Sequence, residues 1–138
     1  MKILTDTNIV LDVILKREPF YTMSMDVLRL AQREDIQEYV SASAITDIYY
    51  LSYRQLRDKK LVKRLIKNLL TVVSVAYVSE CEIFKAIELD WPDFEDTVQY
   101  SVALLQRMEG IVTRNPDDYK RSEITIWCPE ELLKKYRY

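Results

Sequence analysis

Segments with the hydrophobic pattern of β-strands alternate with segments that have the pattern of α-helices along the chain. The residues favour strands at 3–6, 39–42, 71–75, 111–113 and 124–127, with apolar residues at helical spacing between them. Such alternation is typical of parallel sheets, because each right-handed crossover returns the chain to the same edge of the sheet. The sequence therefore predicts an α/β fold: a three-layer α/β/α sandwich with a mostly parallel five-stranded sheet, built as one domain over residues 1–138.

The first predicted strand ends at an acidic residue. The apolar run of Ile3 and Leu4 stops at Asp6, and helical spacing begins near Asn8. Aspartate is depleted in strands, and open α/β sheets bind ligands beyond the carboxyl ends of their strands. We therefore expect Asp6 to be a functional residue. Asp12, about one turn into the helix, fits the edge of a site and an exposed helix surface equally well.

The composition excludes several classes of active site. The chain has no His, which excludes His-ligated zinc and catalytic triads, and its single Gly excludes glycine-rich phosphate-binding loops. Cys81 and Cys128 have no zinc-site spacing, so we expect two buried, reduced thiols in a cytoplasmic protein. No apolar run is long enough for a membrane span, and Asp6 comes too early for a signal peptide. Any catalysis must therefore depend on carboxylates.

Three further acidic clusters follow at positions comparable to the first. Asp47 lies at the start of the helix after the second strand. Asp93, Glu95 and Asp96 open the helix before the fourth strand, and the segment 115–118 (Asn-Pro-Asp-Asp) follows the fourth strand. The carboxyl ends of parallel strands share one edge, and we expect the fourth strand beside the first. The clusters are therefore predicted to converge there.

Each of these acids also has an ordinary structural role. Asp93 suits the N-cap of its helix, Glu95 adds a favourable charge in the first helical turn, and Asp117 suits a turn. For Asp47 and Asp96 the spacing leaves a structural role and a functional role equally open.

A divalent cation would reconcile such a cluster. Three or four carboxylates within a few ångströms repel one another, and a bound cation removes that cost. Ligands that are all oxygen favour Mg²⁺ or Mn²⁺, which keep several waters and bind substrate phosphate. The predicted site therefore suits metal-dependent hydrolysis of a phosphodiester, a reaction that does not require His.

Four stretches together resemble the PIN domain family and are similar to its ribonuclease toxins of VapC type. They are ILTDTNIVLD at 3–12, SASAITDIYY at 41–50, DFEDTVQY at 93–100 and IVTRNPDDY at 111–119. The resemblance implies a parallel five-stranded sheet between helices and metal-dependent cleavage of single-stranded or structured RNA. It also implies a homodimer and a cognate antitoxin with a segment that packs near the acidic pocket.

The resemblance assigns roles to individual residues. It places the family's first three acids on Asp6, Asp47 (where the family more often has Glu) and Asp96. The fourth falls on Asn115, where many members have Asp, and Asp118 is expected to supply the missing carboxylate. We expect Asp6, Asp96 and Asn115 to hold Mg²⁺ or Mn²⁺, and Asp47 to orient or deprotonate the attacking water. The supporting positions are Thr7, Asn8, Asp93 and Thr113.

A basic stretch offers a path for RNA. Residues 54–67 hold seven basic residues against one acid, Asp58, which supplies a local positive charge in a chain of net charge −2. A solvated helix face explains the same pattern. Tyr49, Tyr50 and Tyr53 precede the stretch and suit base stacking, although core packing explains at least two of them. The candidate phosphate contacts are Arg54, Arg57, Lys60 and Arg64.

Three other kinds of protein share features of this sequence. A haloacid-dehalogenase phosphatase needs a second Asp two residues after Asp6, where this chain has Asn8. A phospho-receiver domain needs an Asp after the third strand, where this chain has Val78 and Ser79. The stronger alternative is a catalytically decayed PIN-like module that binds RNA or protein, with its site lost at Asp47 and Asn115.

Overall fold

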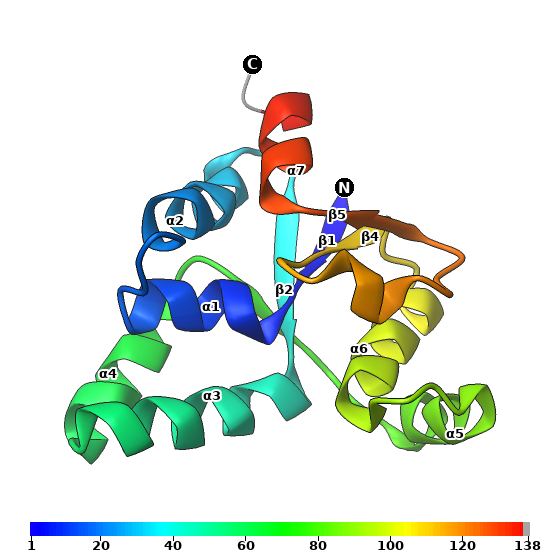
Figure 1. Cartoon of the computed structure of the whole chain (residues 1–138), viewed down its shortest axis with the longest axis horizontal. Coiled ribbons are helices and arrows are strands. Elements are labelled where there is room, and N and C mark those ends of the chain that lie inside the picture. The colour runs from blue at the N-terminus through cyan, green and yellow to red at the C-terminus, as the bar shows by residue number, and fades with distance from the viewer. Residues whose placement is uncertain (137–138) are drawn as a thin grey trace.

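A computed structural model describes residues 1–136 and contains a parallel sheet of five strands in the order β3-β2-β1-β4-β5 (Figure 1). The strands are β1 (Lys2–Thr5), β2 (Gln37–Ser41), β3 (Ser74–Ala76), β4 (Gly110–Val112) and β5 (Thr125–Trp127). The strand order reverses at β1, which pairs with β2 on one side and β4 on the other. The prediction that the fourth strand lies beside the first is therefore confirmed.

Helices cover both faces of the sheet, which confirms the predicted α/β/α sandwich (Figure 1). In the figure α1, α2, α3 and α4 lie to one side of the sheet, and α5 and α6 lie to the other. Their bounds are α1 Thr7–Ile14, α2 Tyr21–Arg29, α3 Ala42–Leu56, α4 Lys59–Leu69, α5 Glu80–Leu89, α6 Phe94–Leu105 and α7 Pro129–Tyr136. Two short 3-10 turns span Leu30–Gln32 and Pro116–Tyr119.

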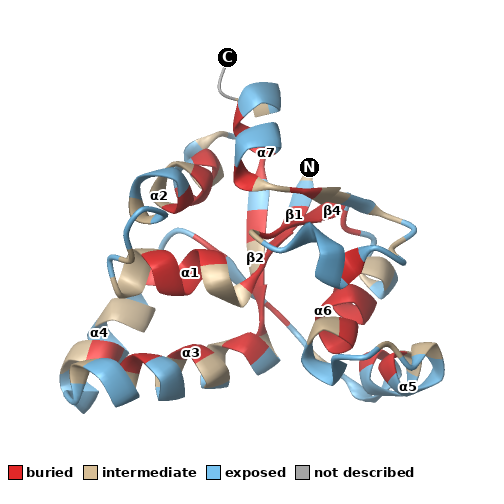
Figure 2. Cartoon of the chain, viewed as in Figure 1, coloured by how far each residue is buried: buried red, intermediate tan, exposed pale blue. Residues whose placement is uncertain are grey.

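The central strand β1 is buried on both faces (Figure 2). Because side chains alternate along a strand, Ile3 and Leu4 point to opposite faces. Ile3 packs with Ile9, and Leu4 packs with Tyr100. Both Ile3 and Leu4 are fully buried, as expected for the middle of a parallel sheet. This burial fixes the position of β1, the strand that ends directly before Asp6.

Several predicted boundaries shift in the structure. The N-cap of α3 is Ser41, whose hydroxyl accepts the backbone N–H of Ala44 at 3.2 Å, and the predicted second strand accordingly ends at Ser41. The predicted third strand at 71–75 is wrong at its start, because Val73 donates its backbone N–H to Leu69 and continues the turn after α4. The prediction that both thiols are buried is also wrong, since Cys81 lies on the exposed side of α5 and Cys128 is half-buried. Among the described residues, no helix is long and apolar enough to cross a membrane.

Candidate active site

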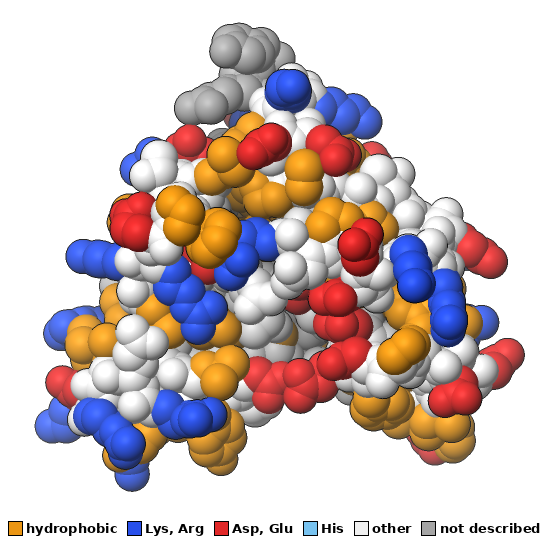
Figure 3. All heavy atoms as spheres, in the orientation of Figure 1, with side chains coloured by type: hydrophobic (Ala, Val, Ile, Leu, Met, Phe, Trp, Pro, Cys, Tyr) orange, Lys and Arg blue, Asp and Glu red, His pale blue; other side chains and the backbone are white. Residues whose placement is uncertain are grey.

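A cleft of about 380 Å³ opens at the edge of the sheet where β1 and β4 end. Acidic side chains gather around a hollow near the lower centre of Figure 3, and basic side chains lie to its lower left. The acids come from the end of β1, from α3, from α6 and from the turn after β4. The cleft is lined by Asp6, Thr7, Asn8, Ser43, Ala44, Asp47, Tyr50, Leu51, Arg54, Glu95, Asp96, Gln99 and Asp118.

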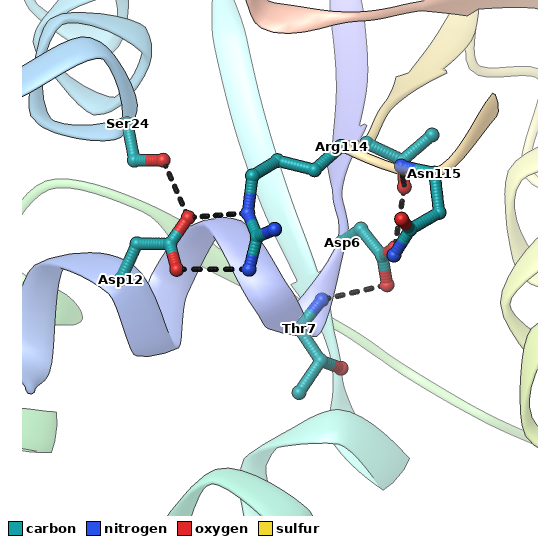
Figure 4. A network of polar contacts seen from close by, with 7 residues as sticks. Asp6, Thr7, Asp12, Ser24, Arg114 and Asn115 are labelled. Carbon is teal, nitrogen blue, oxygen red and sulfur yellow. Dashed lines mark hydrogen bonds and ion pairs between the residues drawn. The ribbon is translucent and has the colours of Figure 1, made fainter. Parts of the chain in front are cut away.

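Asp6 is held by three hydrogen bonds, of which Figure 4 shows the one from Thr7 between labelled residues. Its Oδ1 accepts the backbone N–H of Thr7 at 2.7 Å, so Asp6 is also the N-cap of α1. The same oxygen accepts Nε2 of Gln99 at 2.8 Å, and Oδ2 accepts the hydroxyl of Thr113 at 2.7 Å. The buried carboxylate is thereby fixed in one orientation by donors from α1, α6 and the end of β4.

Asp96 is the acid most perturbed by its surroundings. Burial first, and then the charges of Asp93, Asp6 and Asp118, raise the pKa of Asp96 to about 7. The hydroxyl of Tyr119 offers only a long contact of 3.5 Å to its Oδ1, which lowers the pKa slightly. Among residues 1–136, no ion pair joins Asp96 to a basic side chain.

Asp118 shares the same electrostatic environment. Burial and the charges of Asp6, Asp93 and Asp117 raise the pKa of Asp118. The pKa of the buried Tyr119 hydroxyl is also raised, by burial first and then by the neighbouring acids. Negative charge is therefore concentrated between Asp6, Asp96 and Asp118, and a cation at this place would stabilise it.

A second carboxylate pair connects α3 and α6. The charge of Asp47 raises the pKa of Glu95, and burial and the charge of Asp93 add to the rise. Glu95 was interpreted as a favourable charge in the first helical turn, but its side chain also lines the cleft. Asp47 and Glu95 are therefore close enough for their charges to interact across the cleft.

The other predicted site residues fall into two groups. Thr7, Asn8 and Arg54 line the cleft, and Thr113 is buried against Asp6. Asn115 is exposed and does not line the cleft; its backbone N–H donates to the Thr113 hydroxyl at 3.0 Å.

Asp93 and the remaining basic candidates lie outside this cleft. Asp93 caps α6 by accepting the backbone N–H of Asp96 at 2.9 Å, as expected, and borders a smaller hollow shared with Asp96, Asp117 and Asp118. Arg57, Lys60 and Arg64 are exposed and lie beyond the cleft lining.

Sequence reasoning missed Gln99, Tyr119 and Glu95. Gln99 follows Asp96 by three residues and so shares its helix face, a spacing that identifies it once Asp96 is suspected. Tyr119 has no such signal, because only the turn at Pro116–Tyr119 brings it under α6.

The positions of the oxygen atoms in the cleft determine whether a divalent cation fits there. The expectation that three or four carboxylates crowd within a few ångströms is not met, since no three Asp, Glu or Cys side chains within residues 1–136 form a group that would hold an ion alone. Mg²⁺ is commonly bound by only one or two carboxylates and several waters, so Asp6 and Asp96 suffice. Within the described chain the buried Oε1 of Gln99 also has no hydrogen-bond partner, which leaves an oxygen beside Asp6 for a bound water.

The chain is similar in sequence and in structure to known proteins. The curated protein Ribonuclease VapC1 of Aquifex aeolicus (strain VF5) is 25% identical over 142 residues, which cover 98% of this chain and 95% of that protein. The structure of VapBC-1 from nontypeable Haemophilus influenzae matches with a TM-score of 0.73 and 16% identity over 94% of this chain and 99% of that one. A toxin-antitoxin complex from Klebsiella pneumoniae matches with a TM-score of 0.68 and 19% identity over 91% and 96%.

A family model agrees with these matches. The model described as PIN domain matches residues 2–117, a range that includes the strand ends, the helix starts and most of the turn that form the acidic cleft. The chain therefore belongs to the PIN domain family.

Proposed function

We propose that this chain is a Mg²⁺- or Mn²⁺-dependent endoribonuclease and the toxin of a toxin–antitoxin pair. The observation that carries the proposal is the position of Asp96. It lies half-buried in the cleft, near the charges of Asp6 and Asp118, and forms no ion pair with a basic side chain in the described part of the chain. A hydrated divalent cation offsets that repulsion and prefers oxygen ligands.

In this mechanism Asp6 and Asp96 would hold the cation. When bound, such an ion polarises the phosphate and makes an attacking water more acidic. Thr113 and Gln99 keep the Asp6 oxygens in a fixed orientation, which lowers the cost of assembling the site. Asp47, which lines the same cleft, would orient the attacking water and accept its proton.

The substrate path follows α3 away from the acids. Asp47, Tyr50 and Arg54 are separated by three and four residues, so they line one face of the helix and all reach the cleft. Arg54 suits a phosphate, and the exposed ring of Tyr50 suits an unpaired base. Arg57, Lys60 and Arg64 extend the positive charge beyond Arg54. This arrangement favours single-stranded RNA as the substrate.

The proposed biological context is inhibition by an antitoxin. One similar structure is a toxin-antitoxin complex, and the similar curated protein from Aquifex aeolicus is named a ribonuclease. We infer a cognate antitoxin that covers the acidic cleft, and we retain the prediction of a homodimer.

The test compares Asp6→Asn with Asp117→Asn, a control acid that is exposed and lies outside the acidic cleft. Cleavage of a single-stranded RNA in Mg²⁺ should be lost in Asp6→Asn and retained in the control. Titration with Mn²⁺ should raise the melting temperature of the wild type but not of Asp6→Asn, because only a competent site binds the ion in the folded state. Circular dichroism checks that both variants fold.

Two outcomes would contradict the proposal. Undiminished metal-dependent cleavage by Asp6→Asn would remove Asp6 from the site. RNA binding by the wild type without cleavage and without stabilisation by Mn²⁺ would favour the decayed binding module instead.

A further inference from the structure

The buried carboxylate of Asp12 is paired with Arg114 on the side of α1 away from the acidic cleft (Figure 4). Its Oδ2 accepts Nε of Arg114 at 2.7 Å, and its Oδ1 accepts Nη2 at 3.1 Å. Ser24 of α2 donates its hydroxyl to the same carboxylate at 2.9 Å. The expectation that left Asp12 between the site edge and solvent is therefore wrong on both counts, because Asp12 is completely buried and fully paired.

Arg114 comes from the segment that completes the acidic cleft. It lies directly between Thr113, whose hydroxyl holds Asp6, and Asn115, whose backbone N–H donates to that hydroxyl. Asp118, which lines the cleft, follows four residues after Arg114, and its backbone N–H donates to the carbonyl of Asn115 at 3.1 Å. In Figure 4 the Arg114 side chain extends to Asp12, whereas Asn115 lies beside Asp6.

The guanidinium is restrained on more than one side. Besides its two hydrogen bonds to Asp12, it lies 3.8 Å from the centroid of the Phe20 ring. The planar fork of Arg fits a carboxylate in two places and stacks on an aromatic face, which Lys does not reproduce. This anchor ties the chain after β4 to α1 and α2.

A buried ion pair contributes little net free energy to the stability of a fold. Removing two charges from water costs nearly as much as their attraction returns, so replacement by apolar residues is often neutral. What the pair supplies here is a fixed position for the backbone between β4 and the turn at Pro116–Tyr119. The two neighbours of Arg114 contact the acids directly. Thr113 donates its hydroxyl to Asp6, and the carbonyl of Asn115 accepts the backbone N–H of Asp118.

We propose that the Arg114–Asp12 pair is a positioning element that fixes residues 113–118, so that Thr113 orients Asp6 and Asp118 faces the cleft. The part of this inference that concerns the cation rests on the proposed function. The part that concerns the position of the segment does not. Arg114 acts through Thr113 and Asp118 and does not itself line the cleft.

The test compares Arg114→Met and Arg114→Lys with Leu69→Ala, a core change in α4 that lowers stability without touching the segment. Hydrogen exchange followed by mass spectrometry should show at least about tenfold faster exchange over residues 113–119 in Arg114→Met than in Leu69→Ala. The Mn²⁺ dissociation constant should rise about 10- to 100-fold in Arg114→Met, as for other residues that orient metal ligands, and stay unchanged in Leu69→Ala. Arg114→Lys should recover part of both losses.

A kinetic split separates positioning from simple stabilisation. Below its melting temperature Arg114→Met should lose kcat at saturating Mn²⁺ while the KM for RNA changes little, because Tyr50 and Arg54 are untouched. Unchanged exchange over residues 113–119 in Arg114→Met would overturn the inference, as would equal losses of Mn²⁺ affinity in Arg114→Met and Leu69→Ala. If the wild type neither binds Mn²⁺ nor cleaves RNA, the proposed function fails, and the exchange comparison still decides the positioning role.

Discussion

Replacing Glu38 with Gln tests how a buried carboxyl next to the site strand sets the pH range in which the protein is stable. Glu38 lies on β2, is 2% exposed, and accepts the hydroxyl of Thr5 at 3.0 Å, one residue before Asp6. Burial raises its pKa from 4.5 to about 7, against hydrogen bonds from Thr5 and Ala31 that lower it. The carboxyl is thus neutral in the folded protein over a range in which it ionises in the unfolded chain.

The direction in which stability changes with pH follows from how tightly Glu38 binds its proton in the folded and unfolded states. Between about pH 4.5 and 7 the folded state binds the Glu38 proton more tightly than the unfolded state, so stability falls as the pH rises through this window. The difference between the two pKa values corresponds to about 3 kcal/mol, lost in full above pH 7. For a chain of this size that is roughly 10 °C in melting temperature.

Glu38→Gln keeps an oxygen for Thr5 and removes the titration. Urea unfolding at several pH values from 4 to 9 gives the free energy of unfolding of the wild type and of the variant. The difference between the two at each pH removes the contribution of the titratable groups that both proteins share. The variant should gain about 3 kcal/mol relative to the wild type across this range. Glu34→Gln, an exposed change nearby, should show no such trend. Parallel curves for the wild type and Glu38→Gln would refute the reasoning.

Three further predictions concern the site and its support. Because Asp96 must lose its proton to bind a cation and has a pKa of about 7, Mn²⁺ affinity should rise about tenfold from pH 6 to pH 8, as measured by calorimetry. Tyr50→Leu should raise the KM for single-stranded RNA roughly 5- to 100-fold through lost stacking, whereas Tyr77→Leu, equally exposed but outside the cleft, should not; equal effects would remove Tyr50 from the RNA path. Gly110→Ala should lower stability in urea by about 3 kcal/mol or prevent folding, since an added Cβ would lie 2.3 Å from the carbonyl oxygen of Thr125 and 2.6 Å from the ring of Trp127.

The parts of the site that the sequence predicted depend on local pattern and on topology. An Asp at the end of an apolar run identified Asp6, and the alternation of strands and helices predicted a sheet in which β4 lies beside β1. Together these rules brought Asp6, Asp47 and the segment 115–118 to one edge of the sheet, whereas Asp96 was assigned through the family resemblance; Asp6, Asp47, Asp96 and Asp118 all line the cleft.

The parts that escaped prediction depend on pairs of side chains far apart in the chain. Gln99 lies 93 residues from the Asp6 that it holds, and Arg114 lies 102 residues from Asp12. Neither pairing has a local signature, because each requires the packed positions of α1 and α6 or of α1 and the segment after β4. The same limit explains why the electrostatic interaction between Asp47 and Glu95 was not predicted.

The acids near this edge of the sheet differ chiefly in how their charge is compensated. Asp12 has a permanent cation in Arg114, and Asp6 has three hydrogen-bond donors. For Asp96 and Asp118 the surrounding protein instead raises the pKa, so that each is easier to protonate than a free carboxyl. A protein built only to be stable would gain by removing such groups or by supplying an Arg, as it does for Asp12. The uncompensated acids lie in the open cleft and the compensated Asp12 does not, which is the distribution expected if the missing positive charge comes from solution.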